Sequence, residues 1–353
     1  MSLDCGLTDI QDLLRCVGGE GGNMTVFKSV VKAYHILSVH NNIVVSISGG
    51  SDSDVILDLI YRVNSVLHKS VRYVWFDTGL EYDATKRHLK YLEEYYGIEI
   101  LREKAVKPIP LTCKEYGQPF LSKMVSGAIS GLQNNGFKWE DRPYEELIQE
   151  YPKVKSYIAW WCNKRDTKDF GYSMFNIGYN KYLKEFLIAN PPTFKIGAKC
   201  CKYAKKDVSK LILQRYDCDL LVMGIRKAEG GIRSTKYKTC FSDDASACDT
   251  FRPIFWYQHE DKEFYENTFS IVHSDCYTKY GMRRTGCAGC PYNRKLVEDL
   301  NIIEQYEPNL YRAVNNIFAD SYEYTKQYKL FCEKIREDQS NKQIRLFDLP
   351  DNQ

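Results

Sequence analysis

Short apolar runs alternate with longer amphipathic stretches over residues 43–101. Continuous apolar runs at 43–47 and 71–76 are typical of strands that are buried on both faces. Residues 52–67 and 82–96 repeat apolar side chains at helical spacing, and residues 98–101 predict a third strand. This strand–helix alternation predicts a mainly parallel, doubly wound sheet of the Rossmann-like type, with helices on both faces.

Helical patterns flank this region on both sides. From about residue 113 to residue 195 the segments are rich in Tyr, Trp, Lys and Glu, which predicts a helical insertion, and a strand at 220–224 resumes the sheet. Further helices are predicted at 10–16, 26–39, 144–150, 154–164 and 297–337. The expected organisation is an N-terminal helical segment 1–42, an α/β domain of 43–112 and 197–295, a helical insertion 113–196 and a C-terminal helical segment 296–353.

A glycine-containing loop joins the first predicted strand to the first predicted helix. Such a turn points backbone N–H groups and the positive end of the helix dipole at one spot, which suits a phosphate. The loop lacks the lysine of a Walker A sequence, so its hydroxyls and early-helix amides must supply the donors. The alternative is an ordinary strand–Gly-Gly–helix turn. The loop consists of Ser48, Gly49, Gly50, Ser51, Asp52 and Ser53.

Two polar motifs follow later strands of the predicted sheet. Asp77, Thr78 and Gly79 come directly after the second strand. Because parallel strands end at the same edge, these residues should lie near the glycine loop, where Asp77 could accept hydrogen bonds from an adenosine group. Their structural alternative is capping of the helix at 82–96.

The second motif follows the strand at 220–224. It contains Gly224, Arg226, Glu229 and Arg233. Two arginines there can hold a phosphate or sulfate in a bidentate manner, and Glu229 can keep one of them in place. As an alternative, basic residues at a strand exit are simply solvated.

Together these motifs resemble the PP-loop superfamily, also called the adenine nucleotide alpha hydrolase group, and within it the phosphoadenylyl-sulfate (PAPS) reductase-like family. The loop resembles the family's SGGxDS, residues 77–81 read DTGLE, residues 224–233 resemble GxRxxES..R with Gly230 in place of serine, and residues 252–256 resemble RPI..W. The likeness covers residues 43–295, with the helical insertion as the least matched part.

The resemblance implies a HUP-type fold that binds ATP or a sulfonucleotide, PAPS or adenylyl sulfate, with Mg²⁺. It implies catalytic roles for Asp52, Arg226 and Arg233. The nucleotide-binding residues that it implies are Ser48, Gly49, Gly50, Ser51, Asp52, Ser53, Asp77, Thr78, Gly79, Gly224, Arg226 and Glu229.

Thirteen cysteines are many for this chain, and an odd number cannot all pair. In a reducing compartment, clustered cysteines suggest metal or redox chemistry before disulfides. The pair Cys200-Cys201 with the distant Cys287 and Cys290 resembles the [4Fe–4S] ligand set of the iron–sulfur branch of the family, and soft thiolates suit such a cluster.

Alternatives to this ligand set remain. A zinc site with four thiolate ligands would use the same residues, and Cys240 or Cys248 could replace a member of the vicinal pair. The remaining cysteines are interpreted as small hydrophobic residues. These are Cys5, Cys16, Cys113, Cys162, Cys218, Cys276 and Cys332.

The reductases of this family use a cysteine in a C-terminal ECGxH-type sequence. Here Cys332 is followed by neither glycine nor histidine and falls in a helical apolar pattern, so we interpret it as a buried structural thiol. The preferred hypothesis is therefore a PP-loop enzyme that uses ATP and an iron–sulfur cluster for adenylation-coupled sulfur transfer, with a cysteine desulfurase as sulfur donor. One alternative is a PAPS or adenylyl-sulfate reductase served by thioredoxin. Another is a non-catalytic nucleotide-binding regulator or defence component.

A nucleic-acid substrate, tRNA or DNA, would have to use the helical insertion. Cations and aromatic residues interleave at 153–165, where they could contact phosphates and stack on bases, although such spacing is also typical of a helix core. These residues are Lys153, Lys155, Tyr157, Trp160, Trp161, Lys164 and Arg165. The net charge of +3 is too balanced to indicate nucleic acid by itself. The absence of a membrane-spanning stretch predicts a cytoplasmic protein, and homodimer formation stays open.

Overall fold

The computed structural model describes residues 9–165, 173–230, 236–243 and 248–347, with side chains up to residue 339. The chain divides into two compact units. Unit 1 comprises Met1–Pro108, Tyr203–Ala288 and Ile302–Leu310, and unit 2 comprises Ile109–Lys202, Gly289–Asn301 and Tyr311–Gln353. The N-terminal helices thus belong to the α/β unit, and most of the C-terminal segment belongs with the insertion.

Unit 1 is built on a six-stranded, mostly parallel sheet with strand order β3-β2-β1-β4-β6-β5. Among the strands that the structure describes, β5 alone pairs in antiparallel fashion, with β6. The predicted α/β fold is confirmed, although the third strand begins two residues later than expected. The strands are β1 (Asn42–Ile47), β2 (Ser70–Asp77), β3 (Ile100–Lys104), β4 (Leu220–Met223), β5 (Phe241–Ser242) and β6 (Asp249–Phe251).

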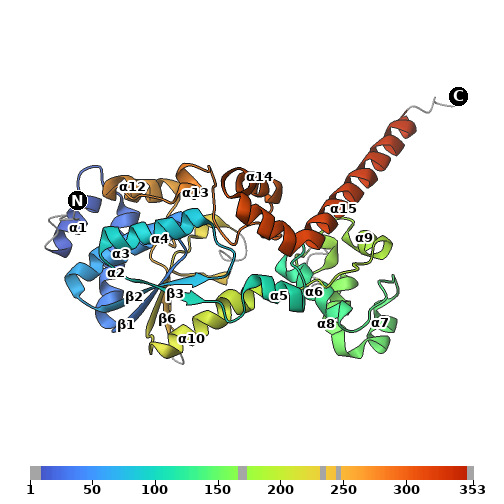
Figure 1. Cartoon of the computed structure of the whole chain (residues 1–353), viewed down its shortest axis with the longest axis horizontal. Helices are drawn as coiled ribbons and strands as arrows, with labels where there is room; N and C mark the ends of the chain where they lie inside the picture. Colours follow the sequence, from blue (N-terminus) through green and yellow to red (C-terminus); the bar gives the residue numbers. More distant parts are fainter. Residues whose placement is uncertain (1–8, 166–172, 231–235, 244–247, 348–353) are drawn as a thin grey trace. The chain divides into compact units, whose positions relative to one another are not determined.

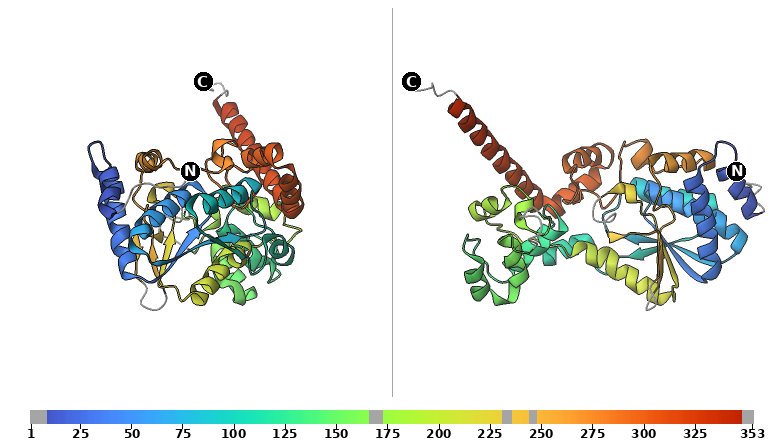
Figure 2. Two further views of the ribbon diagram at one scale, coloured as in Figure 1. Left: turned by 60° about the vertical axis from the view of Figure 1, so that its left-hand side comes forward. Right: turned by 180° about the vertical axis from the view of Figure 1, so that it is seen from behind.

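Alternating side chains of β1 serve two hydrophobic cores. Ile43, Val45 and Ile47 pack with the core that includes α3 (Ser51–Leu67) and α4 (Asp83–Tyr96). Val44 packs on the opposite face with α10 (Asp207–Arg215). Because successive strand residues point to opposite faces, a continuous apolar run requires helices on both sides. Figure 1 shows α3 and α4 on one face of the sheet and α10 on the other, and Figure 2 shows the same layering from two further sides.

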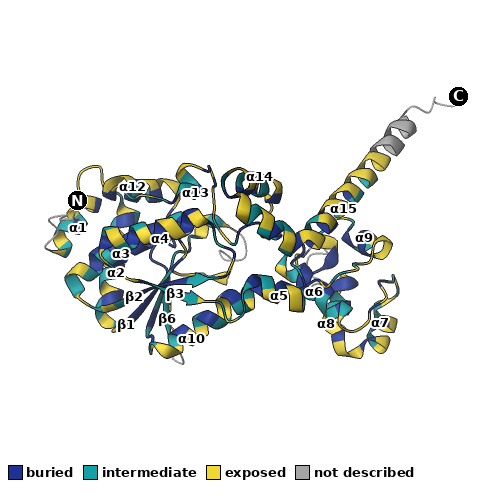
Figure 3. Cartoon of the chain, in the orientation of Figure 1, coloured by how far each residue is buried: buried dark blue, intermediate teal, exposed yellow. Residues whose placement is uncertain are grey.

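Helices from distant parts of the chain complete unit 1. α2 and α12 join the core formed by α3. In Figure 3, α4 shows a buried face and an exposed outer face, the expected pattern for a helix that covers a sheet. The remaining elements are α1 (Ile10–Gly18), α2 (Met24–Val39), the 3-10 helix η4 (Lys227–Glu229), α12 (His259–Phe269), α13 (Asp275–Thr278) and the last part of α14 (Leu296–Tyr306), whose residues up to Asn301 belong to unit 2.

The strand order reverses between β1 and β4, which are hydrogen-bonded neighbours. β2 and then β3 lie on one side of β1 in the sheet, whereas β4 and then β6 lie on its other side. Loops that leave the carboxyl ends of strands at such a reversal diverge and leave a crevice, the usual ligand site of doubly wound sheets. The glycine loop follows β1, and the Gly224–Arg226 segment follows β4.

Unit 2 is helical, with its own apolar core centred on residues such as Phe120, Trp160 and Phe186. A single parallel bridge joins Gln118 and Ile196. Its elements are α5 (Ile109–Tyr116), α6 (Lys123–Gln133), α7 (Tyr144–Glu150), η1 (Pro152–Val154), α8 (Lys155–Trp161), η2 (Ile177–Tyr179), α9 (Leu183–Ala189), the π-helix η3 (Lys202–Lys206), which continues into unit 1, and α15 (Pro308–Phe347).

Burial removes Trp160 and Trp161 from the base-stacking surface considered for residues 153–165. Trp160 and Trp161 are fully buried, and the Trp161 indole nitrogen donates to the Glu140 carbonyl at 3.0 Å. Trp161 also packs edge-on against Phe137. The flanking lysines are exposed. Solvent therefore reaches the positive charges of this segment but not the two indole rings.

The part of the chain that the structure describes contains no helix both long and apolar enough to cross a membrane. Even α15, which has a kink at Phe318, carries many charged side chains.

A buried polar cluster ties three helices of unit 1 together. The Asp58 carboxylate, fully buried on α3, accepts hydrogen bonds from Arg62 Nε at 2.7 Å, from the Tyr96 hydroxyl at 2.9 Å and from the Tyr265 hydroxyl at 2.7 Å. Tyr96 belongs to α4 and Tyr265 to α12. A buried charge is tolerated only with such complete pairing.

We expect Asp58→Ala to lower the free energy of unfolding by about 3–5 kcal/mol, because it leaves the buried Arg62 guanidinium without its carboxylate. The measurement is chemical denaturation. The matched control is Glu94→Ala, which breaks the i,i+4 pair with Lys90 on the surface of α4 and should cost less than about 0.5 kcal/mol. Equal losses in the two variants would contradict a special role for Asp58.

Candidate functional site

The glycine loop takes a conformation that requires glycine. Gly49 has φ +66°, and a Cβ atom there would lie 2.6 Å from Thr85 Cγ2. Gly50 is the N-cap of α3, and a Cβ atom on it would lie 3.1 Å from the Tyr277 hydroxyl. The first amides of a helix lack intrahelical partners. The loop therefore exposes the start of α3 to a ligand at close range.

The three loop serines have different surroundings. Ser53 is buried, and its oxygen accepts from the Ser48 amide at 2.9 Å, so it holds the loop in shape. Ser48 is exposed, and its oxygen accepts from the Gly50 amide at 3.3 Å. Ser51 accepts from Lys262 Nζ at 2.8 Å. Ser48 and Ser51, rather than Ser53, have hydroxyls placed toward a ligand.

The segment after β4 lies directly against the loop. A Cβ atom on Gly224 would lie 3.1 Å from the Asp52 carbonyl oxygen, so glycine favours this close approach. Arg226 then donates from Nε to Asp52 Oδ1 at 2.9 Å. The Glu229 side chain hydrogen-bonds Asp52, the carboxylate that also binds Arg226. Arg233 lies outside the described residues.

Asp52 is the acceptor for two cations. Besides Arg226, the ammonium of Lys262 lies 3.3 Å from Asp52 Oδ1. Burial alone would raise the pKa of Asp52, but the hydrogen bond with Glu229 and the charges of Lys262 and Arg226 outweigh it and lower the pKa. Asp52 is thus a carboxylate that positions cations. Its lowered pKa disfavours a role in proton transfer.

A second carboxylate of the same helical turn is also paired. Asp54, 1% exposed, lies 2.8 Å from His273 Nδ1 and 3.0 Å from His88 Nε2. The other nitrogen of His273 lies 2.7 Å from Glu266 Oε1. Burial disfavours the charged imidazole, but these hydrogen bonds prevail and raise the pKa of His273 to about 9. With a carboxylate at each nitrogen, His273 carries two protons at neutral pH.

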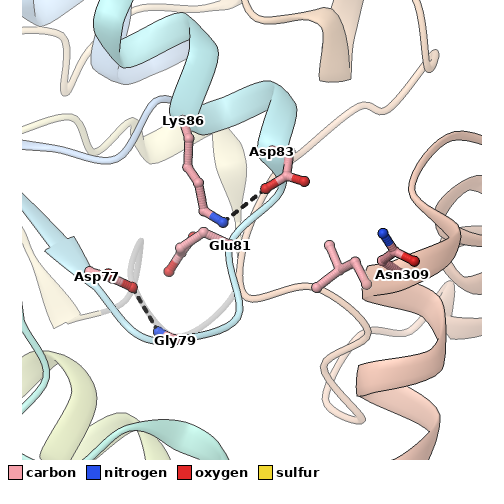
Figure 4. Close-up of a pocket in the computed structure, with 7 residues that line it drawn as sticks. Asp77, Gly79, Glu81, Asp83, Lys86 and Asn309 are labelled. Carbon is pink, nitrogen blue, oxygen red and sulfur yellow. Dashed lines mark hydrogen bonds and ion pairs between the residues drawn. The ribbon is translucent and has the colours of Figure 1, made fainter.

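The loop after β2 lines a polar hollow of about 360 Å³. The Asp77 carboxylate accepts from the Gly79 amide at 2.9 Å, and Gly79 has φ +84°. Figure 4 shows Asp77 and Glu81 beside this hollow. Its lining residues are Asp77, Gly79, Glu81, Asp83, Lys86, Asn309 and Leu310. Such acceptors suit the hydroxyl and amino groups of a nucleoside rather than its phosphates.

Thr78, by contrast, is fully buried and has no exposed surface for a nucleotide. Its hydroxyl donates to Glu81 Oε1 at 2.6 Å, and Cys287 Sγ lies 3.6 Å from the Thr78 hydroxyl oxygen. The Ala288 amide donates to the Leu80 carbonyl at 3.0 Å. In unit 1 these contacts attach Cys287 to the loop that follows β2.

The other predicted thiolate ligands belong to unit 2. Cys200 is buried, and its hydrogen bond with Cys201, its burial and the nearby sulfurs of Cys201, Cys113 and Cys290 raise its pKa far above the ordinary value. Cys113, interpreted from the sequence as an isolated hydrophobic residue, therefore belongs to this group. Soft sulfur donors of this kind match iron or zinc in type.

The alternative ligands lie elsewhere. Cys248 Sγ is 3.3 Å from Cys218 Sγ, at the amino ends of β6 and β4, which is the edge of the sheet opposite to Cys287. This position disfavours Cys248 as a ligand. Cys240 is buried against Ile225 and Phe255. Cys332 is also buried, as expected for a structural thiol.

No group of three or more His, Cys, Asp or Glu side chains within residues 9–165, 173–230, 236–243 and 248–339 is arranged to hold a metal ion. The predicted Mg²⁺ and cluster positions therefore stay predictions.

The residues that sequence reasoning missed are Lys262, Glu266, His273, Asp54 and His88. With Asp52 and Arg226 they form one chain of paired polar side chains. Lys262 and Glu266 are one helical turn apart on α12, a recognisable i,i+4 pair. Nothing local in the sequence indicates that this pair faces the glycine loop.

We expect the free energy of unfolding to fall as the pH rises from about 6.5 to about 9. The pKa of His273 is raised on folding, and such a group stabilises the native state below its unfolded pKa. The stabilisation is lost as pH rises through the folded pKa of about 9. His273→Asn should remove up to about 3 kcal/mol at pH 6 and little at pH 10. Denaturation at several pH values measures this, with the exposed His259→Asn as control. A parallel pH dependence in wild type and His273→Asn would contradict it.

Residues 42–120 match the model of the phosphoadenosine phosphosulfate reductase domain. The uncharacterized protein MJ0066 of Methanocaldococcus jannaschii is 30% identical over 149 residues, which make up 42% of this chain. The chain matches only 28% of that relative's length.

Solved structures are similar at low sequence identity. The PAPS reductase of Candida auris is 11% identical, with a TM-score of 0.38 over 81% of this chain and 98% of that one. The U34-tRNA thiolase NcsA of Methanococcus maripaludis, solved with its [4Fe-4S] cluster, is 12% identical, with a TM-score of 0.36 over 87% and 81%. These scores are too low to assign a function. The family match covers the glycine loop and the DTGLE motif, and it extends over less than half of the chain.

Proposed function

We propose that this protein is an adenine-nucleotide enzyme of sulfur chemistry that binds ATP at the glycine loop and activates a substrate by adenylation. One observation carries the proposal. The loop after β1, the start of α3 and Arg226 after β4 meet at the strand-order reversal of the sheet, with Arg226 Nε 2.9 Å from Asp52. This arrangement combines backbone donors with a fixed guanidinium, as phosphate binding requires.

The nucleoside would occupy the polar hollow beside the loop after β2. Asp77 and Glu81 supply acceptors there, and Gly79 leaves room for close approach. The phosphates would lie at Ser48, Gly50 and the start of α3. Both positions belong to unit 1 and to the same carboxyl edge of the sheet, where ligands of doubly wound folds bind.

In the proposed reaction a substrate oxygen attacks the α-phosphorus of ATP. A new P–O bond forms, the bond to the β-phosphate breaks, and pyrophosphate leaves with the electron pair. The loop amides and Arg226 would stabilise the charge that develops on the phosphoryl oxygens. Hydrosulfide from a sulfur donor then displaces AMP from the activated carbon, which exchanges a C–O bond for a C–S bond.

In unit 2, Cys200, Cys201 and Cys290 would bind an iron–sulfur cluster, and zinc is the alternative. When bound, a cluster would supply sulfur chemistry. The support is the mutual interaction of the unit 2 thiols and the donor type. Because the Trp160 and Trp161 rings are buried, a nucleic-acid acceptor would contact the exposed cations of residues 153–165 and not these rings.

Sulfonucleotide reduction is the second candidate, favoured by the family match of residues 42–120. The burial of Cys332, whose Sγ lies 3.7 Å from the Lys181 carbonyl oxygen, counts against this thiol as the nucleophile. A nucleotide-binding regulator without turnover is the third candidate.

We expect Gly49→Ala to weaken ATP binding at least tenfold, measured by calorimetry, because the added methyl group would meet Thr85 Cγ2 and displace the loop. The matched control is Gly97→Ala. Gly97 has φ +63°, close to +66° at Gly49, but a Cβ atom there meets nothing within 4 Å. Gly97→Ala should lose about 1 kcal/mol of stability and keep its ATP affinity.

Equal affinities of wild type and Gly49→Ala would contradict nucleotide binding at this loop. Products then distinguish the candidates. Pyrophosphate and AMP formation that depends on an acceptor supports adenylation. Sulfite from a sulfonucleotide with thioredoxin supports reduction, and tight binding without any product supports a regulator.

We expect anaerobically purified protein to contain iron and acid-labile sulfide, and Cys200→Ser to lower the iron content per chain by more than half. Loss of one thiolate opens the site to solvent and oxygen. Iron and sulfide analysis with a visible spectrum measures this, and Cys16→Ser, at an exposed position, is the control. Stoichiometric zinc without iron would contradict the cluster.

A further inference from the structure

We propose that Lys262, carried on α12, is the phosphate-binding cation of the glycine loop, in place of the lysine that a Walker A loop carries within its own sequence. This inference rests on the proposed function, in which residues 48–53 bind the phosphates of a nucleotide. It assigns to the loop a residue 211 positions away from Ser51 in the chain. The anionic ligand class is a di- or triphosphate.

The Lys262 ammonium is placed at the loop by three contacts. Nζ lies 2.8 Å from Ser51 Oγ, 3.3 Å from Asp52 Oδ1 and 3.0 Å from Glu266 Oε1. Lys262 is 8% exposed, although its side chain could reach solvent from a surface helix. A lysine is rarely buried to this degree without a charged partner or a ligand.

The contact with Ser51 makes that hydroxyl a donor toward a ligand. A serine hydroxyl has one hydrogen and two lone pairs. Because the ammonium has no acceptor capacity, Ser51 Oγ must accept from Lys262, and its hydrogen is directed elsewhere. Ser51 is the first residue of α3, so an anion bound at the helix start is an available acceptor.

The carboxylates at the start of α3 give a second reason to assign phosphate binding to Lys262. Asp52 and Asp54 lie in the first turn of α3, beside the amides that would bind the phosphate. Each would repel an anion if it were unpaired. His273 pairs with Asp54. Beside Asp52, the two cations Arg226 and Lys262 together leave a net positive charge, whereas one cation would only neutralise the carboxylate. Without Lys262 the loop would face the phosphate with one cation and one carboxylate.

The position of α12 is fixed independently of any ligand. Tyr265, one turn after Lys262, donates its hydroxyl to the buried Asp58 at 2.7 Å. Glu266, the next residue along α12, is held by His273 at 2.7 Å. The ammonium is therefore preorganised at the loop, which lowers the ordering cost of binding.

The competing explanation is that Lys262 only neutralises Asp52 and Glu266 and so stabilises the fold. A structural role predicts lost stability with unchanged phosphate affinity in the folded protein. A phosphate-binding role predicts an affinity loss that a relocated lysine restores.

The experiment measures binding of ATP and of inorganic pyrophosphate by calorimetry to the full chain. We expect Lys262→Gln to weaken both ligands by about 10- to 100-fold, the effect of one charge-assisted hydrogen bond. Lys262→Arg should bind within about threefold of wild type, since it keeps the charge. Lys90→Gln, on the exposed face of α4, is the control and should bind like wild type.

A second variant distinguishes loss of the cation from misfolding of Lys262→Gln. Adding Ser51→Lys to Lys262→Gln returns a lysine to the loop itself and should recover most of the lost pyrophosphate affinity. Wild-type affinity in folded Lys262→Gln would overturn the assignment while nucleotide binding stands. A loss that neither Lys262→Arg nor Ser51→Lys restores would also overturn it and mark a structural role. If wild type binds neither ligand, the proposed function fails, and the inference fails with it.

Discussion

The first turn of α3 places two carboxylates beside the backbone amides that are best placed to receive a phosphate. Asp52 and Asp54 suit the positive end of a helix, but they oppose an anionic ligand unless their charge is compensated. Arg226 from the end of β4, Lys262 from α12 and His273 from the segment before α13 supply that compensation. Elements distant in sequence are thus held at one point by electrostatics.

The periodicity of the chain predicted most of the α/β unit. β1, α3, β2 and α4 were predicted within two residues, because continuous apolar runs and helical spacing are local properties. The same periodicity left two interpretations open at Trp160 and Trp161, since aromatic residues at helical spacing look alike whether they face a core or a nucleic acid. Only the tertiary packing around Phe137 and Trp139 distinguishes these cases.

The site was predicted in part. The glycine loop, Asp77 and Arg226 follow strand ends, and parallel topology brings strand ends together, so their neighbourhood was predictable. Thr78 and Ser53 instead turned out to be buried, because a motif does not say which of its side chains turn inward. Lys262 and His273 could not be predicted, since their contacts depend on how α12 packs on α3. The Asp58 cluster that fixes this packing involves three separate helices.

In the proposed site, the two-residue glycine turn and the lysine on α12 form one phosphate-binding unit whose two parts lie far apart in the sequence. With a cation arriving from position 262, position 51 is free to be a small hydroxyl residue, and the loop alone then looks incomplete to any motif that expects a lysine there. In homologous sequences, positions 51 and 262 should therefore be compared as a pair.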